Sequence, residues 1–302
     1  MMIRFMKLML IFAVPVLFFA ACDTENGKEE LESGWINLYL TDAPIDTDGI
    51  TGVFITFNEI QYHLQGDEWA VFDEFEGPAT VNLMDYTRGI ATLMGYFELL
   101  PGTYTQIRFM LEAPEHGQGP PTNPGCYLEF EDGTTEPLFV PSGSQSGFKA
   151  TGKFTVPVNG SVDVTADFDL RKSIVAAGNS GRYILKPTIR LIVNDQAGRI
   201  VGEVSNIPEG FGVVIYAYDA GTYTEDEAND PAGEEVRFPN AINSDMVCEN
   251  NMFHIDYLAE GLYDLIVTLT VEGGFLELAA IIEDVEVLAG QTTYYNIDFS
   301  EF

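Results

Sequence analysis

Basic residues are scarce in this chain of 302 residues. Only 14 Lys and Arg stand against 47 Asp and Glu, which gives a formal net charge of −33 at pH 7. A protein that binds nucleic acid neutralises phosphates with a basic surface, so the charge balance excludes that class. It also argues against docking on anionic lipid. Two roles remain open for this acidity, namely solubility and the attraction of divalent cations.

Cysteine and histidine are also scarce, with three of each in the chain. Because the sequence contains no Cys-x-x-Cys pair, these residues argue against a structural zinc site. A disulfide between Cys126 and Cys248 is one interpretation for an oxidising compartment. Two separate buried thiols are an equally good one, because the two cysteines fall in different candidate domains. The third cysteine, Cys22, directly follows an apolar segment.

That segment is the single long apolar run of the sequence. Arg4 and Lys7 precede it, and the 14 residues 8–21 carry no charge. A helix needs roughly 20 apolar residues to cross a bilayer, so the run is too short for a permanent span. A charged start, a short apolar stretch and small residues such as Ala20 and Ala21 before a cleavage point are typical of a signal peptide. We therefore expect residues 1–21 to be an export signal.

The end of this signal resembles a bacterial lipobox, with Phe19 in place of the more usual Leu and with Cys22 as the residue that becomes lipidated. Residues 22–33 are polar and acidic and predict a flexible linker. The acidic residues behind Cys22 also resemble the export signals of Bacteroidetes surface lipoproteins. We expect an outer membrane lipoprotein of the cell envelope, facing the periplasm or the cell surface. The alternative is a plain signal peptide that leaves Cys22 unmodified.

Alternation of apolar and polar residues dominates the rest of the chain and predicts an all-β fold of half-buried strands. Hydrophobic residues are 46% of the sequence, which is ample for a core. The pattern restarts near residues 194–198, so we expect two antiparallel β-sandwich domains, at residues 34–195 and 198–302. The second shows seven candidate strands, at residues 200–204, 211–218, 236–243, 253–258, 262–271, 276–288 and 292–299. A short helix is expected around residues 83–93.

One short pattern occurs in both predicted domains. Leu99-x-x-Gly102-x-Tyr104 precedes a strand in the first, and Leu258-x-x-Gly261-x-Tyr263 precedes one in the second. Gly provides a turn conformation that other residues resist, while Tyr packs its ring and extends its hydroxyl towards the main chain. We therefore expect the same turn-into-strand element in both domains.

Several motifs of the first domain, over roughly residues 35–194, resemble a bacterial lipoprotein family known as domain of unknown function 4382. The resemblance implies no activity, because that family has no established function. The motifs are LYLTDAP from Leu38, VFITFNEI from Val53, LPGTYTQIR from Leu100, PSGSQSGF from Pro141, DFDLRKSI from Asp167 and LKP from Leu185.

The second domain resembles a carboxypeptidase-regulatory-like, or prealbumin-like, sandwich. The residues that carry this resemblance are Gly202-Glu203-Val204, Val214-Ile215-Tyr216-Ala217-Tyr218, the Leu258/Gly261/Tyr263 element and Val287-x-x-Gly290-Gln291-Thr292. Modules of this kind often accompany surface and carbohydrate-processing proteins, and their superfamily includes starch-binding domains. The resemblance therefore implies an Ig-like or prealbumin-like fold and is compatible with a role in glycan binding.

Acidic side chains form one candidate metal site. Asp42, Asp46 and Asp48 place three carboxylates within seven residues beside a strand end, and oxygen-rich loops of this kind suit Ca²⁺. The spacing is not that of an EF-hand, because Val53 stands where the bidentate Glu would be. A solvated acidic turn is the favoured alternative. A second, weaker cluster comprises Asp226, Asp230, Glu234 and Glu235, where an exposed loop is the simpler interpretation.

A second acidic group lies along one predicted strand. Asp163, Asp167 and Asp169 share its polar face, and the cations of Arg171, Lys172 and Arg190 are placed to neutralise them across neighbouring strands. Carboxylate pairs also perform glycoside hydrolysis, but nothing in the pattern distinguishes such a pair from ordinary surface charges. The sequence shows no Gly-x-Ser-x-Gly, His-Glu-x-x-His or phosphate-binding loop.

Aromatic side chains provide the remaining hypothesis for binding. Tyr216 and Tyr218 share one face of a predicted strand, so we expect them to lie exposed together as a flat platform for sugars. The alternative is that they belong to the core, as most large aromatic side chains in sandwiches do. The other candidates are Trp35, Tyr39, Trp69, Tyr294 and Tyr295.

These features predict a protein that binds rather than catalyses. The leading hypothesis is a non-enzymatic binding or accessory module of the cell envelope, held on the membrane by a lipid at Cys22, with surface glycan as its ligand and Ca²⁺ as its one candidate cofactor. The alternative is a structural or adhesion component that recruits a protein partner. A hydrolase comes third.

Overall fold

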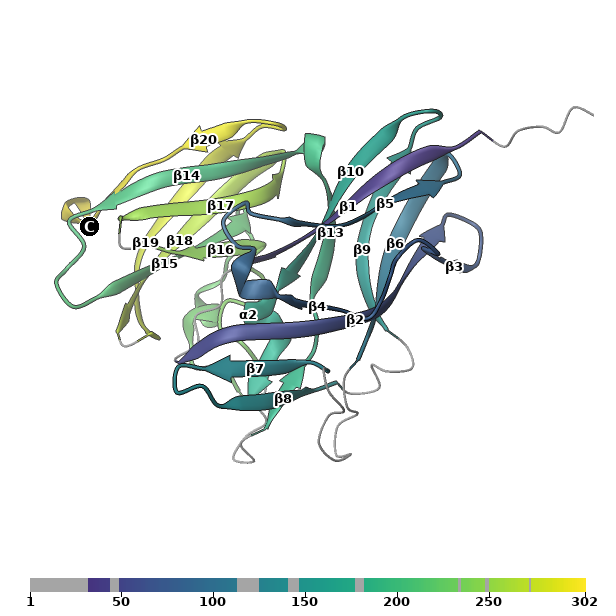
Figure 1. Cartoon of the computed structure of the whole chain (residues 1–302). Coiled ribbons are helices and arrows are strands. Elements are labelled where there is room, and N and C mark those ends of the chain that lie inside the picture. The colour runs from purple at the N-terminus through teal and green to yellow at the C-terminus, as the bar shows by residue number, and fades with distance from the viewer. Residues whose placement is uncertain are drawn as a thin grey trace, which may run out of the picture. The chain divides into compact units, whose positions relative to one another are not determined.

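The computed structural model describes residues 32–43, 49–112, 125–140, 147–176, 182–232, 235–247, 250–271 and 273–302. Residues Glu32–Phe302 form one compact unit. Nearly all regular structure in it is β, as the alternation predicts (Figure 1). No helix among the described residues is long and apolar enough to cross a membrane.

Strands β1–β13 form one hydrogen-bonded sheet in the order β11-β12-β8-β7-β2-β6-β9-β13-β10-β1-β5, with β3 and β4 attached to β2. We call this the first sheet set. Its strands are β1 (Gly34–Ala43), β2 (Ile50–Leu64), β3 (Trp69–Val71), β4 (Ala79–Asn82), β5 (Thr92–Leu99), β6 (Gly102–Leu111), β7 (Tyr127–Phe130), β8 (Thr135–Phe139), β9 (Phe148–Val156), β10 (Ser161–Asp169), β11 (Ile174–Ala176), β12 (Tyr183–Leu185) and β13 (Ile189–Val193).

Most pairs in this sheet are antiparallel, but β1 and β10 run parallel over their whole length, from Trp35 opposite Ser161 to Ala43 opposite Asp169. The pairs β8/β12 and β9/β13 are parallel as well. More than a hundred residues separate β1 from β10, which provides the long connection that parallel neighbours require. The first sheet set is therefore mixed rather than purely antiparallel.

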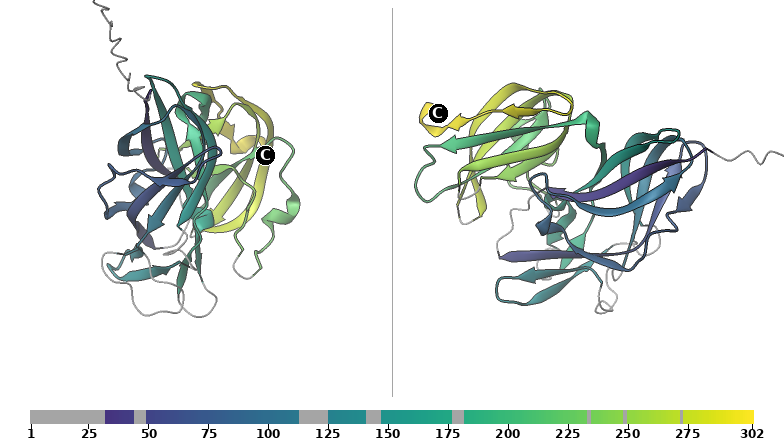
Figure 2. Two further views of the ribbon diagram at one scale, coloured as in Figure 1. Left: turned by 90° about the vertical axis from the view of Figure 1, so that its right-hand side faces the viewer. Right: turned by 45° about the horizontal axis from the view of Figure 1, so that its top comes forward.

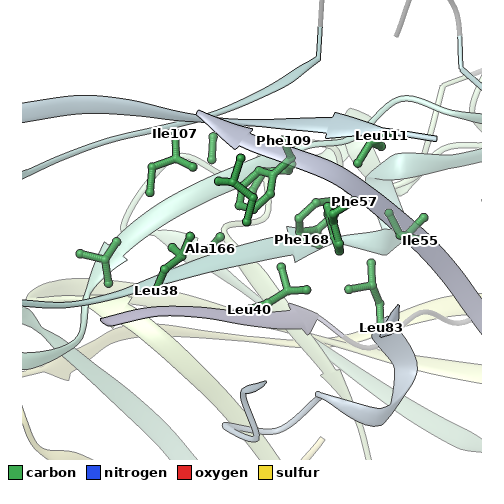
Figure 3. Packing of buried hydrophobic residues seen from close by; sticks show 14 of the residues in the cluster. Leu38, Leu40, Ile55, Phe57, Leu83, Ile107, Phe109, Leu111, Ala166 and Phe168 are labelled. Atoms are coloured by element: carbon green, nitrogen blue, oxygen red, sulfur yellow. The ribbon is translucent and has the colours of Figure 1, made fainter. Parts of the chain in front are cut away.

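The core of the first sheet set lies between faces of this one folded sheet. Phe57 of β2 and Phe168 of β10 are far apart in the strand order, yet their ring centroids lie 6.0 Å apart. Figure 3 shows side chains from β1 and β10 packing with side chains from β2 and β6 in one cluster. Its labelled members are Leu38, Leu40, Ile55, Phe57, Leu83, Ile107, Phe109, Leu111, Ala166 and Phe168.

Two local features of this set follow sequence patterns, and one local prediction is wrong. The register of β2 against β6 shifts between Phe57 and Glu59, where the alternation of apolar residues changes parity. Asp132-Gly133 forms the hairpin turn between β7 and β8, with Gly133 at φ 78°. The helix expected around residues 83–93 is a single 3-10 turn, η1 (Leu83–Asp85), because Tyr86 leaves the helical region at φ −121° and ψ 57°, and the positive φ of Arg88 and Gly89 prevents a helix from restarting before β5.

Strands β14–β21 form two further sheets, which we call the second sheet set. One has the order β17-β14-β20 with β21 attached to β14, and the other has the order β16-β15-β18-β19. Figure 2 shows the two sheets stacked on each other in green to yellow. Their strands are β14 (Ala197–Ser205), β15 (Gly212–Asp219), β16 (Asn243–Met246), β17 (Met252–Ala259), β18 (Gly261–Val271), β19 (Gly274–Val287), β20 (Thr292–Tyr294) and β21 (Ile297–Asp298).

The interior of this sandwich is apolar, with Ile200, Ile215, Phe253 and Leu265 fully buried. One predicted strand is wrong: residues 236–242 are not in a strand, and β16 starts at Asn243, where that strand was expected to end. A 3-10 turn, η3 (Asn194–Gln196), joins β13 to β14. Strand pairing thus changes near the expected border of the two domains, and the division into domains itself stays a prediction.

Candidate functional site at the junction of the two sheet sets

The end of β10 carries two buried carboxylates. Asp167 and Asp169 are almost fully buried, whereas Asp163 is exposed and accepts a 2.6 Å hydrogen bond from Asn37. Arg190 lies directly opposite Asp167 on β13, and its Nε donates to Asp167 Oδ2 at 2.8 Å. The predicted pairing of Arg190 with this strand across the sheet is confirmed.

Asp169 obtains its cations from the turn that follows it. The chain forms one helical turn, α2 (Leu170–Ser173), and Asp169 Oδ1 caps it by accepting from the main-chain N–H of Lys172 at 3.2 Å. Lys172 Nζ lies 3.2 Å and an Arg171 amino nitrogen lies 3.5 Å from Asp169 Oδ2. The predicted partners are therefore correct, but they belong to the same turn rather than to a neighbouring strand.

The cations of this turn also contact the second sheet set. One amino group of Arg171 donates to the main-chain carbonyls of Arg237 and Phe238, at 2.9 Å each. Lys172 Nζ donates to the carbonyl of Ala241 at 2.5 Å. Each cation thus joins a carboxylate of the first sheet set to the main chain of the second.

Arg190 repeats this arrangement one strand away. While its Nε and one amino group engage Asp167, its other amino group donates to the carbonyl of Tyr257 at 2.9 Å. Arg88, in the turn before β5, contacts the second sheet set as well. Its Nε lies 3.1 Å from Asp245 Oδ1, and one of its amino groups donates to the carbonyl of Met246 at 2.9 Å. We call these four cations with Asp167, Asp169 and Asp245 the junction cluster.

Burial governs the ionisation of this cluster. Desolvation raises the pKa of Asp167, and the Arg190 guanidinium opposes that rise. Desolvation likewise raises the pKa of Asp245, against the hydrogen bond from the His254 main chain and the attraction of Arg88. Burial lowers the pKa of Lys172, and the nearby carboxylate of Asp169 opposes that fall. Charges buried in this way are held by their partners, and removing one partner leaves the other uncompensated.

The tyrosines expected to form an exposed platform are buried, so that expectation is wrong. Tyr216 and Tyr218 do share the outer face of β15, but residues after β15 pack on that face, among them Tyr223, Ala228, Phe238 and Ala241. Phe238 packs on Tyr216 with ring centroids 4.3 Å apart. The hydroxyl of Tyr218 donates to Glu227 Oε2 at 2.9 Å, and burial together with Glu227 raises the pKa of Tyr218. These rings belong to a small second core of the sandwich.

The candidate calcium site is only partly within the described residues. Asp46 and Asp48 lie outside them, so the calcium prediction stays untested. Asp42 is buried, and its Oδ1 accepts from the main-chain N–H of Leu170 at 3.1 Å. In the second acidic cluster, Asp230 is paired with Arg237 at 2.6 Å, and Glu234 is outside the description. Among the described residues, no group of three or more His, Cys, Asp or Glu side chains could hold a metal ion.

Cys126 is a buried free thiol, and desolvation raises its pKa to about 12. Of the two interpretations of the cysteines, the structure thus favours a separate buried thiol at this position. Cys248 and Cys22 lie outside the described residues.

A pocket of about 250 Å³ lies beside the junction cluster. Its walls come from the turn before β5, from the η3–β14 connection, from the end of β17 and from the turn before β20. No local sequence pattern predicts this pocket, because these four segments meet only in the folded chain. The lining residues are Gly89, Asn194, Ala197, Gly198, Arg199, Asp256, Tyr257, Gly290, Gln291 and Thr292.

Asp256 is the buried acid of this pocket, with 7% of its surface exposed. Its Oδ1 lies 3.8 Å from an Arg199 amino group, and Oδ2 has no hydrogen-bond partner among the residues that the structure describes. Arg199 is itself oriented by the 2.7 Å hydrogen bond from its Nε to Thr292 Oγ1. Desolvation raises the pKa of Asp256, and Arg199 opposes that rise.

Comparison with known proteins gives one family. Residues 33–187 match the family described as Domain of unknown function (DUF4382), which covers the first sheet set up to β12 and the residues just after it. No curated protein matches the chain.

Solved structures resemble the chain only weakly. The minor pilin GBS52 of Streptococcus agalactiae is 12% identical, with 87% of this chain and 94% of the pilin covered and a TM-score of 0.21. The shaft pilin SpaA of Lactobacillus rhamnosus GG is 12% identical, with 88% and 97% covered and a TM-score of 0.24. The Bacillus anthracis TIE protein is 11% identical with a TM-score of 0.19, and the match spans 88% of this chain but only 34% of that protein. Similarity this low says nothing about what this chain does.

Proposed function

Because the chain belongs to the family described as Domain of unknown function (DUF4382), whose description names no activity, we propose a function from this chain's own structure: it is a non-enzymatic accessory module of the cell envelope that binds surface glycans. The observation that carries the glycan proposal is the polar pocket beside Asp256, and the junction cluster, whose charged groups hold the two sheet sets together, supports its non-enzymatic part.

Non-enzymatic action is supported by how the ionisable groups are used. A general acid or base must reach a substrate proton within hydrogen-bond distance. Asp167 and Asp245 instead face Arg190 and Arg88, and the cations of α2 are engaged by Asp169 and by main-chain carbonyls. Groups held in this way stiffen a scaffold, which suits presentation of a binding surface.

Glycan as the ligand class is supported by charge. A net charge of −33 repels phosphate and other polyanions, whereas a neutral sugar is indifferent to it. The pocket beside Asp256 also combines a carboxylate acceptor with guanidinium and amide donors, and hydroxyl groups of a sugar can pair with both.

The cell-envelope location is supported by the N-terminal sequence. Residues 1–21 have the features of an export signal and Cys22 the position of a lipidated residue. We expect metabolic labelling with a lipid probe to mark the wild-type chain and to be lost in Cys22→Ser. A label that persists in Cys22→Ser overturns the anchor.

The glycan proposal is tested with the full chain on a glycan array, in a detergent that has no sugar headgroup. We expect binding to a subset of neutral glycans and none to sulfated or phosphorylated ones. The heat-denatured chain is the control for adsorption. If no glycan on the array is retained, the chain is not a glycan-binding module.

A structural or adhesion component that recruits a protein is the second candidate. One observation favours it: the edge strand β5 exposes the apolar side chains of Leu93 and Tyr96. Unpaired sheet edges with apolar side chains are sites where another chain can add. Crosslinking on intact cells, compared between wild type and Leu93→Lys/Tyr96→Lys, separates this candidate from glycan binding, since those substitutions leave the pocket unchanged.

A further inference from the structure

The outer face of the sheet β17-β14-β20 gathers polar side chains around one buried acid. Strand alternation places Ile255 in the core and Asp256 on the opposite face, and Arg199 pairs in register with Thr292 on the neighbouring strand. The hydrogen bond between Arg199 and Thr292 holds the guanidinium beside Asp256. A donor and an acceptor are thus held side by side at the pocket.

We propose that this pocket holds one neutral sugar residue of a glycan, with Asp256 and Arg199 binding adjacent hydroxyl groups and the Tyr294 ring stacking on the next sugar. This assignment rests on the function proposed above and names the site where it occurs.

The charge of the pocket selects a neutral ligand. Asp256 and Arg199 offset each other, so neither an ammonium group nor a carboxylate gains from entering. A hydroxyl group both donates and accepts, so neighbouring hydroxyls can give a hydrogen bond to the carboxylate and receive one from the guanidinium. The side chains of Asn194 and Gln291 add further amide donors and acceptors to the wall.

The size of the pocket fits a single ring. Its volume of about 250 Å³ is below the roughly 300–1,000 Å³ typical of sites for drug-sized ligands. The space beside Gly290 is open, since a Cβ on this residue would meet nothing within 4 Å. A glycan chain can therefore enter with its terminal residue while the remainder stays outside.

Tyr294 lies where the second sugar would be. It is two residues beyond Thr292 on β20, so both side chains lie on the same face of the strand. Its side chain is 79% exposed, the largest exposed fraction among the exposed large hydrophobic residues of the described chain. An aromatic ring open to solvent beside a polar pocket provides a flat apolar surface for the face of a sugar.

The experiment measures binding of methyl glycosides of neutral hexoses, and of the matching disaccharides, to the full chain in the same detergent, by saturation-transfer NMR and titration. We expect Asp256→Asn and Arg199→Ala each to weaken binding of both ligands about tenfold, as loss of a charge-assisted hydrogen bond predicts. Tyr294→Ala should weaken the disaccharide about tenfold and change the monosaccharide little, because only the second sugar meets its ring.

The matched controls are Asp163→Asn and Arg182→Ala, which replace exposed residues of the same types outside the pocket. Thermal melts show that each variant is folded, and Asp256→Asn keeps the shape of the side chain. If the wild-type chain binds sugar and the dissociation constants of Asp256→Asn and Arg199→Ala stay within twofold of the wild-type value, the sugar binds elsewhere. That result overturns this site but not glycan binding. A wild-type chain that binds no neutral sugar at tens of millimolar overturns both the site and the proposed function.

Discussion

The hydroxyl of Tyr104 donates to the main-chain carbonyl of Leu100, four residues earlier, at 2.8 Å. Tyr263 does the same to the carbonyl of Ala259, also at 2.8 Å. Both rings are buried, and each tyrosine follows a tight turn between two consecutive strands that are not neighbours in a sheet, β5 and β6 in the first case and β17 and β18 in the second. The repeated Leu-x-x-Gly-x-Tyr pattern thus marks the same corner in both sheet sets, similar to the tyrosine corner of Ig-like sandwiches.

Removing either hydroxyl should weaken the fold modestly. We expect Tyr104→Phe and Tyr263→Phe each to lower the free energy of unfolding by about 1 kcal/mol, because the ring is kept and one hydrogen bond is lost. Urea denaturation followed by circular dichroism measures the difference. Tyr294→Phe is the control, since its ring is largely exposed. Equal stability of all three variants and wild type would show that these bonds contribute nothing.

Local patterns of the sequence predict most strands of this fold, since one face of each is buried. The alternation of apolar and polar residues around Val164 and Phe168 predicts the strand β10, and Asp132-Gly133 indicates the hairpin turn between β7 and β8. The expected helix at residues 83–93 is reduced to the turn η1 because Tyr86 leaves the helical region and Arg88 adopts a positive φ, which is uncommon for a residue other than glycine.

The site was less predictable because its partners are remote and partly main chain. The pairing of Asp167 with Arg190 could be read from opposite charges near neighbouring strands. The acceptors for Arg171 are carbonyls, which every residue carries, so no sequence pattern identifies them. The burial of Tyr216 is hidden from the local pattern for a related reason: Phe238, which packs on its ring, lies 22 residues away in the sequence.

The thiol of Cys126 should be unreactive in the folded chain. Its burial raises the pKa to about 12, so almost no thiolate is present at about pH 8, and reagents cannot reach it. In a Cys22→Ser/Cys248→Ser background, we expect maleimide labelling to be slow in buffer and fast in urea. Mass spectrometry at timed intervals measures both rates. Fast labelling in buffer would show that the sheet around β7 opens readily.

Asp256 should make stability depend on pH in a defined direction. Burial raises its pKa above 3.8 in the folded chain, so the folded state binds this proton more readily than the unfolded state. The ionised group therefore costs stability at pH 7, and that cost disappears as the pH falls through the raised pKa. Asp256→Asn should melt at a higher temperature than wild type at pH 7, with the difference shrinking towards about pH 4.

Asp163→Asn is the control for this profile, because it replaces an exposed aspartate on β10. If the difference in melting temperature between wild type and Asp256→Asn is the same at all pH values from about 4 to 7, ionisation of Asp256 does not cost stability.

Arg171 should hold the two sheet sets in one cooperative unit. Arg171→Ala removes the donors to the carbonyls of Arg237 and Phe238 and leaves Asp169 with Lys172 alone. Because the pair is buried, we expect a loss of about 3 kcal/mol in the free energy of unfolding. Arg182→Ala, an exposed arginine of the first sheet set, should change it by less than about 0.5 kcal/mol.

The positions of the two tryptophans allow the coupling between the sheet sets to be measured. Trp35 and Trp69 both belong to the first sheet set, so tryptophan fluorescence follows that set, whereas circular dichroism follows all strands. We expect the two denaturation curves to coincide for wild type, as they do for a single cooperative unit, and to separate for Arg171→Ala. Coincident curves at unchanged stability in Arg171→Ala would show that the bonds of Arg171 do not couple the sets. The rigid-scaffold role proposed for the junction cluster would then have to rest on Arg190 and Arg88.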